Sequence, residues 1–306
     1  MNEWYRALGI SKQAFHQKVK RIEKELEHSN NLLPIINQIR KDHPTMGARD
    51  MYHIIQPEHL GRDKFEAMVR QEGLISERPK NYRKTTDSQG VKRFDNLTLD
   101  IKLTNFDQLW QSDITYFEIN KRFYYLTFII DVFSRLIVGY NVSKRLTTEQ
   151  TTIKALENAI KFRDKSKLPG LILHSDGGGQ YYSNEFLKLT QQYEIKNSMC
   201  QYPWENANAE RINGTIKNNY LKHYQIDSYE VLVKSVDRSV WLYNNEKPHS
   251  GLKRKTPIAF EKSLSLDKEI YPTMSSQRRN KKPPALQGSA LRAEGNLSSE
   301  SYIAQE

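Results

Sequence analysis

The order of strands and helices expected after residue 97 restricts the fold of this chain more than any other feature. Three strand-like segments come first, joined by short turns at residues 120–121 and 131–134, and helices and strands then alternate. The expected strands are residues 109–117, 123–130, 135–142, 171–174 and 195–199, and the expected helices are residues 148–163, 184–193, 206–220 and 229–243. This order predicts an α/β fold in which helices flank a mixed, five-stranded sheet.

The first part of the chain has the period of small helices instead. Ser11 is placed to cap a helix that runs towards Glu27, and the step from His43 to Pro44 ends a further helical segment. The apolar residues of the first helix recur at helical spacing and are Phe15, Val19, Ile22 and Leu26. Two short helices follow and end near Gly73, which fits a C-terminal cap. A helix, a short turn and a helix form the outline of a helix-turn-helix module.

Basic residues on the last of these helices make it a candidate DNA reader. In a helix-turn-helix module the second helix of the pair lies in the major groove, where Arg62, Lys64 and Arg70 would meet phosphates or base edges. A helical bundle with solvated basic residues is the alternative interpretation. The polar segment that follows carries Arg83 and Lys84, and we expect it to track a DNA backbone.

These changes of period and composition predict four consecutive parts. They are a helix-turn-helix-like DNA-binding region (residues 1–76), a basic linker (77–96), a core that contains the sheet (97–270) and a disordered tail (271–306). Disorder is expected for the tail because it has few large apolar residues and cannot bury enough surface to offset chain entropy.

The composition favours a polyanionic partner and a reducing compartment. The net charge is +11, and Lys and Arg contacts to phosphate release condensed counterions. The single cysteine, Cys200, excludes an intrachain disulfide. The N-terminal residues lack the apolar core of a signal peptide, and no apolar stretch is long enough to cross a bilayer. We therefore expect a cytoplasmic protein that associates with the nucleoid and has no membrane partner.

Three acidic residues stand where the expected fold would bring them together. Asp113 lies in the first strand, Asp176 directly follows the fourth, and Glu210 lies in the helix expected to cross the sheet edge. Carboxylate oxygens suit hard divalent cations, and two such ions stabilise both the attacking and the leaving oxygen of a phosphodiester displacement. Glu205 competes for the third position. Five residues on a helix turn a side chain by about 140°, so only one of the two glutamates can face the metals.

Short motifs run through the chain in a fixed order. They are Trp110–Tyr116, Ile130–Arg135, His174–Asp176, Gly179–Tyr181, Asn206-Ala207 with Glu210, Tyr243–Asn245, Pro248–Leu252 and Thr256-Pro257. With these motifs the chain resembles the bacterial insertion-sequence transposases of the retroviral-integrase-like DDE group, and specifically their downstream (OrfB-type) catalytic product. Met46–Arg49 and Val69–Leu74 are similar to the family's helix-turn-helix segment. The resemblance covers residues 35–262 and implies a ribonuclease-H-like integrase catalytic core over residues 97–270.

The resemblance implies a DNA transposase that nicks the 3′ ends of an insertion sequence and uses the freed hydroxyl to attack another strand. Asp113, Asp176 and Glu210 would hold two Mg²⁺ ions, with Mn²⁺ as a substitute, and Lys217 would touch the transposon end. The implied partners are double-stranded DNA, as transposon ends and target, and further copies of the chain on that DNA. An upstream-frame helix-turn-helix protein is a further candidate partner.

The spacing of the acids departs from the family pattern. This chain has 33 residues between Asp176 and Glu210 (177–209), two fewer than is usual, and the shortening falls in the loop at residues 199–204. The glycines at 177–179 replace a more mixed turn. They fit either a close approach of DNA or a flexible turn.

Four further residues are interpreted as structural. Asp131, in a turn, and His174, at a strand end, are expected to support the fold and not to bind metal. Trp110 and Trp204 are expected to anchor the core or a loop and not to stack on bases. Two other functions stay open at this point: a catalytically silent DNA-binding regulator with the same fold, and a ribonuclease-H-type nuclease that acts on RNA–DNA hybrids. The intact acidic trio argues against the regulator, and a helix-turn-helix suits duplex ends better than hybrids.

Overall fold

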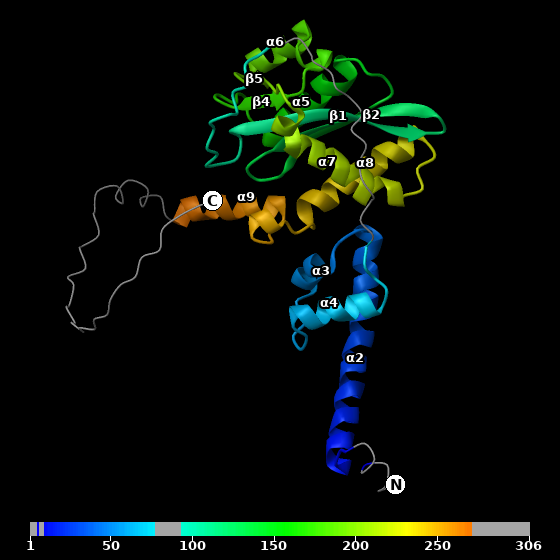
Figure 1. The fold of residues 1–306 in the computed structure, drawn as a ribbon. Helices are drawn as coiled ribbons and strands as arrows, with labels where there is room; N and C mark the ends of the chain where they lie inside the picture. Colours follow the sequence, from blue (N-terminus) through cyan, green and yellow to red (C-terminus); the bar gives the residue numbers. More distant parts are fainter. Residues whose placement is uncertain (1–4, 6–8, 77–92, 271–306) are drawn as a thin grey trace, which may run out of the picture. The chain divides into compact units, whose positions relative to one another are not determined.

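A mixed sheet forms the centre of the longer described part of the chain (Figure 1). The computed structural model describes Tyr5 and residues 9–76 and 93–270. Its strands are β1 (Leu109–Ile119), β2 (Arg122–Asp131), β3 (Ile137–Ser143), β4 (Ile172–Ser175) and β5 (Lys196–Met199). The strand order is β3-β2-β1-β4-β5, with β1 to β3 antiparallel and β4 and β5 parallel to β1. This topology confirms the ribonuclease-H-like α/β fold.

The first hairpin of the sheet follows from its turn residues. Asn120 and Lys121 have φ angles of 50° and 64°, the left-handed backbone of a two-residue turn whose twist matches that of the strands. This turn places Ile119 opposite Arg122 and brings the two longest strands into register. The first two expected strands fall inside β1 and β2.

Helices cover both faces of the sheet (Figure 1). They are α5 (Lys154–Arg163) and α6 (Asn184–Gln192) on one face and α7 (Ala207–Asn219) and α8 (Tyr229–Asn245) on the other, with α9 (Pro257–Ile270) after them. A π-helical turn at Glu149–Ile153 precedes α5, so the helix expected from residue 148 is regular only from Lys154. Short 3₁₀ turns lie at Gly179–Tyr181, Pro203–Asn206, Leu221–His223 and Ser250–Leu252.

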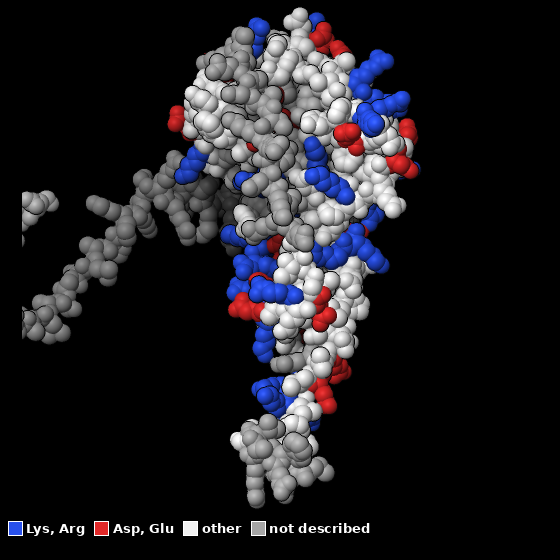
Figure 2. All heavy atoms as spheres, turned by 45° about the vertical axis from the view of Figure 1, so that its right-hand side comes forward, with Lys and Arg blue, Asp and Glu red and all other residues white. Residues whose placement is uncertain are grey.

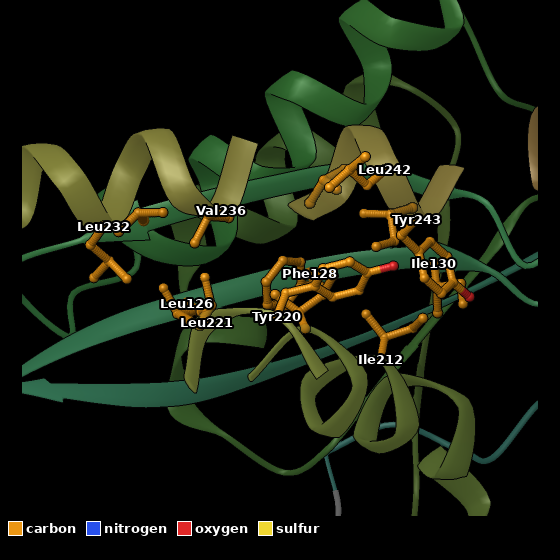
Figure 3. Close-up of a cluster of buried hydrophobic side chains, with 14 of the residues drawn as sticks. Leu126, Phe128, Ile130, Ile212, Tyr220, Leu221, Leu232, Val236, Leu242 and Tyr243 are labelled. Carbon is orange, nitrogen blue, oxygen red and sulfur yellow. The ribbon is translucent and has the colours of Figure 1, made fainter. Parts of the chain in front are cut away.

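Alternate residues of β2 point to the two faces of the sheet. Leu126, Phe128 and Ile130 pack against Ile212 of α7 and against α8, as Figure 3 shows. Ile129, between them, packs on the other face in a cluster with Trp110, α5 and α6. From Leu126 to Ile130 β2 is buried on both faces, so this stretch is apolar except for Thr127 and does not alternate.

The N-terminal helices are α2 (Lys12–Asp42), α3 (Ala48–Ile55) and α4 (Arg62–Gln71). Their apolar cluster includes Ile36, Met51, Phe65 and Val69, all fully buried. α2 corrects the sequence-based expectation of two helices before His43, because it is continuous and contains Pro34. A proline inside a helix costs about 3 kcal/mol, and the packing of this half of α2 into the cluster compensates for it.

The other half of α2 makes fewer apolar contacts than its pattern suggested. Ser11 caps the helix as expected, with its Oγ accepting a hydrogen bond from the Ala14 N–H at 3.1 Å. Ile22 and Leu26 are nevertheless 44% and 58% exposed. The expected linker residues 77–92, with Arg83 and Lys84, and the expected tail 271–306 lie outside the described residues. Among the described helices, none combines the length and apolarity that a bilayer span requires.

Candidate active site

Asp113 and Asp176 lie on neighbouring parallel strands at matching positions. Ser112 of β1 is in register with Ser175 of β4, so each aspartate comes one residue after a paired serine. Adjacent strands lie about 4.8 Å apart, which makes the two aspartates close neighbours. The buried hydroxyl of Tyr181 lies 2.8 Å from the Ser112 Oγ and fixes the residue before Asp113.

The surroundings of Asp113 disfavour its charge. Burial comes first, followed by the carboxylates of Asp176 and Glu210, and together they raise the pKa of Asp113 to about 7. Two hydrogen bonds oppose the rise, from the Ile114 N–H to Oδ1 (2.9 Å) and from the Asn213 amide to Oδ2 (2.8 Å). The ionised form of Asp113 is therefore destabilised both by burial and by its two acidic neighbours.

Asp176 is held by the glycine turn that follows β4. Its Oδ1 accepts a hydrogen bond from the Gly178 N–H at 3.1 Å. Burial raises the pKa of Asp176, and this hydrogen bond lowers it. A Cβ at Gly178 would lie 3.0 Å from the same oxygen, so glycine leaves the room that the carboxylate occupies. The turn continues into the 3₁₀ segment Gly179–Tyr181.

One face of α7 lies along β1 at Asp113. Asn213 contacts the Asp113 carboxylate, and Lys217, one turn later, donates from Nζ to the Thr115 Oγ1 at 3.1 Å. Glu210 lies one turn before Asn213 on the same face of the helix, and its side chain is exposed. Burial raises the pKa of Glu210. Within residues 9–76 and 93–270, no three or more Asp, Glu, His or Cys side chains are grouped as they would be around a bound metal ion.

The start of α7 is tied to β1 by amide side chains. The Asn206 amide donates to the Ser112 carbonyl at 3.0 Å. Gln111 donates to the Glu205 carbonyl at 2.9 Å and accepts from the Asn208 N–H at 3.2 Å. These bonds attach the helix that carries Glu210 to the residues immediately before Asp113.

The Glu205 carboxylate is hydrogen-bonded to the backbone of its own loop. Its Oε2 accepts hydrogen bonds from the N–H groups of Gln201 (2.6 Å) and Tyr202 (3.1 Å), at the start of the 3₁₀ segment Pro203–Asn206. Glu205 thus lies at the start of a helical segment, where the N–H groups favour a negative charge. Glu210 is the glutamate that remains on the α7 face next to Asp113.

The other competing residues have structural partners. Asp131 is fully buried, and its carboxylate accepts from the N–H groups of Ser134 (2.8 Å) and Asp107 (2.6 Å). His174 is also buried, with its Nδ1 2.9 Å from the Ser198 Oγ, and burial lowers its pKa to about 4. Both side chains thus serve the fold, as the sequence indicated.

The expected DNA-contact residues of α4 lie on its outer surface. Arg62, Lys64 and Arg70 are exposed, whereas Phe65, Met68 and Val69 are buried. Arg62 pairs with the Asp63 carboxylate at 2.8 Å. Figure 2 shows Lys and Arg side chains spread over one face of the molecule with Asp and Glu among them. Charge alone therefore does not outline a DNA path on that face.

Two residues of the site were not predicted from the sequence. Asn213 orients Asp113, and Tyr181 supports Ser112. A signal for Asn213 was present, because it follows Glu210 by three residues on an expected helix. Tyr181 lies in a quoted motif, but its contact joins segments 69 residues apart and has no local signature.

Known proteins resemble the chain in both sequence and structure. The integrase core domain family matches residues 104–202, and a second family of the same description matches residues 191–257. The 31 kDa protein of insertion element IS600 from Shigella sonnei is 27% identical over 266 residues, which cover 82% of this chain and 95% of that protein. The transposase of insertion sequence element IS904 from Lactococcus lactis is 31% identical over 164 residues, 53% of this chain and 64% of that protein.

A solved structure similar to this one is the HTLV-2 integrase catalytic core domain in complex with magnesium. Its TM-score is 0.41 and its sequence identity 28%, over 51% of this chain and 97% of that chain. The two integrase core matches span residues 104–257, which contain the five-stranded sheet and also Asp113, Asp176 and Glu210. The chain therefore belongs to the bacterial insertion-sequence DNA transposases that have an integrase-like catalytic core.

Proposed function

We propose that the chain is a metal-dependent polynucleotidyl transferase that nicks the 3′ ends of its insertion sequence and joins them to a target strand. The observation that carries the proposal is the meeting of β1, β4 and α7 at Asp113. There the strand register brings in Asp176, and the bond from Asn213 brings in the helix face that bears Glu210. No comparable feature favours a silent regulator or a hybrid nuclease.

The donor set fits Mg²⁺, with two ions bound and Mn²⁺ as a substitute. The proposed ligands, Asp113, Asp176 and Glu210, offer only oxygen, which hard divalent cations prefer. The raised pKa of Asp113 also fits, because burial causes most of the rise and repulsion by Asp176 and Glu210 adds to it, and a bound cation would offset both by stabilising the ionised carboxylate. Glu210 is exposed and can change rotamer to join the aspartates without disturbing the core. When bound, such ions stabilise the charge on the attacking and leaving oxygens of the phosphodiester.

Other residues of the chain would position the helix and the DNA. Asn213 keeps Asp113 oriented towards α7, and the bonds of Gln111 and Asn206 hold the start of that helix. Lys217 lies further along the same face, and we propose that it meets a phosphate of the transposon end. Arg62, Lys64 and Arg70 on the outside of α4 are proposed to contact duplex DNA.

Further parts of the proposal concern organisation and partners. We propose that residues 1–76 form the DNA-binding region, residues 77–96 a linker that contacts DNA through Arg83 and Lys84, residues 97–270 the catalytic core and residues 271–306 a tail. Double-stranded DNA is the proposed partner, bound by more than one copy of the chain and, in one arrangement, by an upstream-frame helix-turn-helix protein. The proposed location is the bacterial cytoplasm, at the nucleoid.

Replacing one carboxylate tests the catalytic assignment. Asp176→Asn keeps the size of the side chain and removes its charge, so cleavage and strand transfer should fall by at least about a hundredfold while DNA binding is retained. Asp227→Asn is the matched control, because Asp227 is exposed in the segment before α8. Cleavage is measured on duplexes that carry the DNA flanking the coding region, with Mg²⁺ present. Strand transfer by Asp176→Asn at the wild-type rate would refute the assigned role.

A further inference from the structure

Two aromatic rings stack on each other in the loop between β5 and α7, and both are exposed. The rings of Tyr202 and Trp204 have centroids 4.5 Å apart and an angle of 4° between their planes. Tyr202 is 50% exposed and Trp204 is 69% exposed. Of the two tryptophans expected to anchor the core or a loop, Trp110 is a core residue with no exposed surface, whereas Trp204 lies in a loop and contacts Tyr202.

The loop that carries this pair is fixed at both ends beside the proposed metal ligands. At its start, the Cys200 N–H donates to the Ser175 carbonyl at 2.9 Å, next to Asp176. At its end, the Gln111 amide donates to the Glu205 carbonyl at 2.9 Å, two residues before Asp113. The aromatic pair thus stands on a segment that links the two aspartates.

The Glu205 side chain also fixes the backbone of the loop. Its carboxylate accepts the N–H groups of Gln201 and Tyr202, which fixes the backbone on which the first ring stands. Parallel rings held in this way lose little further conformational freedom when a third flat group stacks on them. Two large exposed aromatic side chains on a loop tied to the segments of Asp113 and Asp176 favour a binding role.

We propose that Tyr202 and Trp204 form a stacking platform for one unpaired nucleobase of the DNA at the active site. This inference rests on the proposed function, because it takes DNA as the substrate. Aromatic side chains stack on bases of any sequence, and offset parallel stacking suits a flat ring added to an existing parallel pair. A base inside a duplex already stacks on its neighbours, so only an unpaired or extruded base can use the platform.

The position of the platform gives it a role in the reaction. A base held beside Asp113 and Asp176 keeps the strand next to the reacting phosphate apart from its complement. The platform would therefore favour DNA ends whose terminal bases are unpaired. It is a positioning device and takes no part in the transfer itself.

The test compares two DNA probes in a binding assay that requires no cleavage. Both are the same short duplex with a single-stranded overhang, made of thymidines in one probe and of abasic residues in the other. The full chain binds each in EDTA, and fluorescence anisotropy gives the two affinities. We expect wild type to prefer the thymidine overhang, and Trp204→Ala to lose a preference of about 5- to 150-fold, the range of base–aromatic stacking.

Two further variants keep the test independent of folding. Trp204→Phe retains a ring and should keep most of the preference for thymidine. Trp241→Ala removes another exposed tryptophan, 54% exposed on α8, and should keep all of it. Circular dichroism and melting temperature confirm that each variant is folded.

Each outcome bears on a different claim. A wild-type chain that binds both probes equally, or a Trp204→Ala variant that keeps the preference for thymidine, overturns the platform and leaves the proposed function intact. Equal weakening of both probes by Trp204→Ala also overturns it and assigns the pair to a protein or backbone contact. A folded wild-type chain that binds neither probe contradicts the proposed function itself.

Discussion

Gly178 leaves room for the Asp176 carboxylate because it has no side chain. Its N–H binds the Asp176 carboxylate, and a Cβ in its place would lie 3.0 Å from Asp176 Oδ1 and 3.2 Å from the Gln180 side-chain oxygen. The neighbouring Gly179 differs, because a Cβ there would meet the Tyr182 hydroxyl at an ordinary 3.5 Å. A side chain at position 178 would therefore crowd the Asp176 carboxylate, whereas a side chain at position 179 would not.

We predict that Gly178→Ala lowers cleavage of the transposon end by about ten- to a hundredfold, because small displacements of a reacting group cost rates of that order. Gly179→Ala is the matched control and should keep nearly wild-type cleavage. Single-turnover cleavage at saturating DNA measures both rates, and circular dichroism checks the fold. Equal rates for the two variants would show that the position of Asp176 tolerates the added methyl group.

The sequence alone did not predict the surroundings of Asp113 and Asp131 or the exposure of Trp204. Asp113 and Asp131 both lie in strands of the same hairpin, although the sequence predicted Asp131 to lie in a turn; it is the last residue of β2. The structure separates them physically: Asp131 is saturated by Ser134 and Asp107, whereas Asp113 faces other carboxylates. The exposure of Trp204 could not be predicted, because it depends on how the loop is tied to β1 and β4.

At the scale of elements, α7 connects the sheet to the third carboxylate. Asn213 is its main contact with Asp113 and is only 6% exposed. The other polar atom of its side chain, Oδ1, is buried and has no hydrogen-bond partner among the described residues. The bond to Asp113 is thus the side-chain hydrogen bond that fixes the Asn213 amide, which favours a role in orienting Asp113.

We predict that Asn213→Ala lowers the rate of cleavage at saturating DNA by about tenfold or more and changes DNA affinity little, because it disturbs the orientation of Asp113 and makes no proposed DNA contact. Asn218→Ala is the control, since five residues turn the side chain by about 140° from Asn213. Measurements of cleavage rate and of binding by anisotropy separate the two effects. A loss confined to affinity would place Asn213 in DNA binding instead.

Elements were predictable where local chemistry defines their ends. The turn at Asn120 and Lys121 has a left-handed backbone that short polar loops supply, and both flanking strands were expected within two residues of their bounds. α2 was not expected as one helix, because Pro34 normally interrupts helices. Packing in the N-terminal cluster overrides that local preference, and such long-range packing is not visible in a local pattern.

For the whole molecule, the titration of Asp113 makes the free energy of unfolding depend on pH when no metal is present. The pKa of Asp113 is about 7 in the folded protein and about 3.9 in an unfolded chain, so the folded state binds a proton that the unfolded state releases between these values. The contribution of this group to the free energy of unfolding is fully present below about pH 4. It is lost as the pH rises through about 7.

Metal binding should reverse this loss, and the two effects together give a prediction for the intact chain. Mg²⁺ requires the ionised carboxylate, so its apparent affinity should fall by about tenfold from about pH 8 to about pH 6. We predict that Mg²⁺ raises the melting temperature of wild type, relative to EDTA, more at about pH 8 than at about pH 6. Asp113→Asn should raise the melting temperature in EDTA at the higher pH and should abolish most of the Mg²⁺ effect at both. Scanning fluorimetry of both proteins gives all the values, and a Mg²⁺ shift that survives in Asp113→Asn would remove Asp113 from the set of metal ligands.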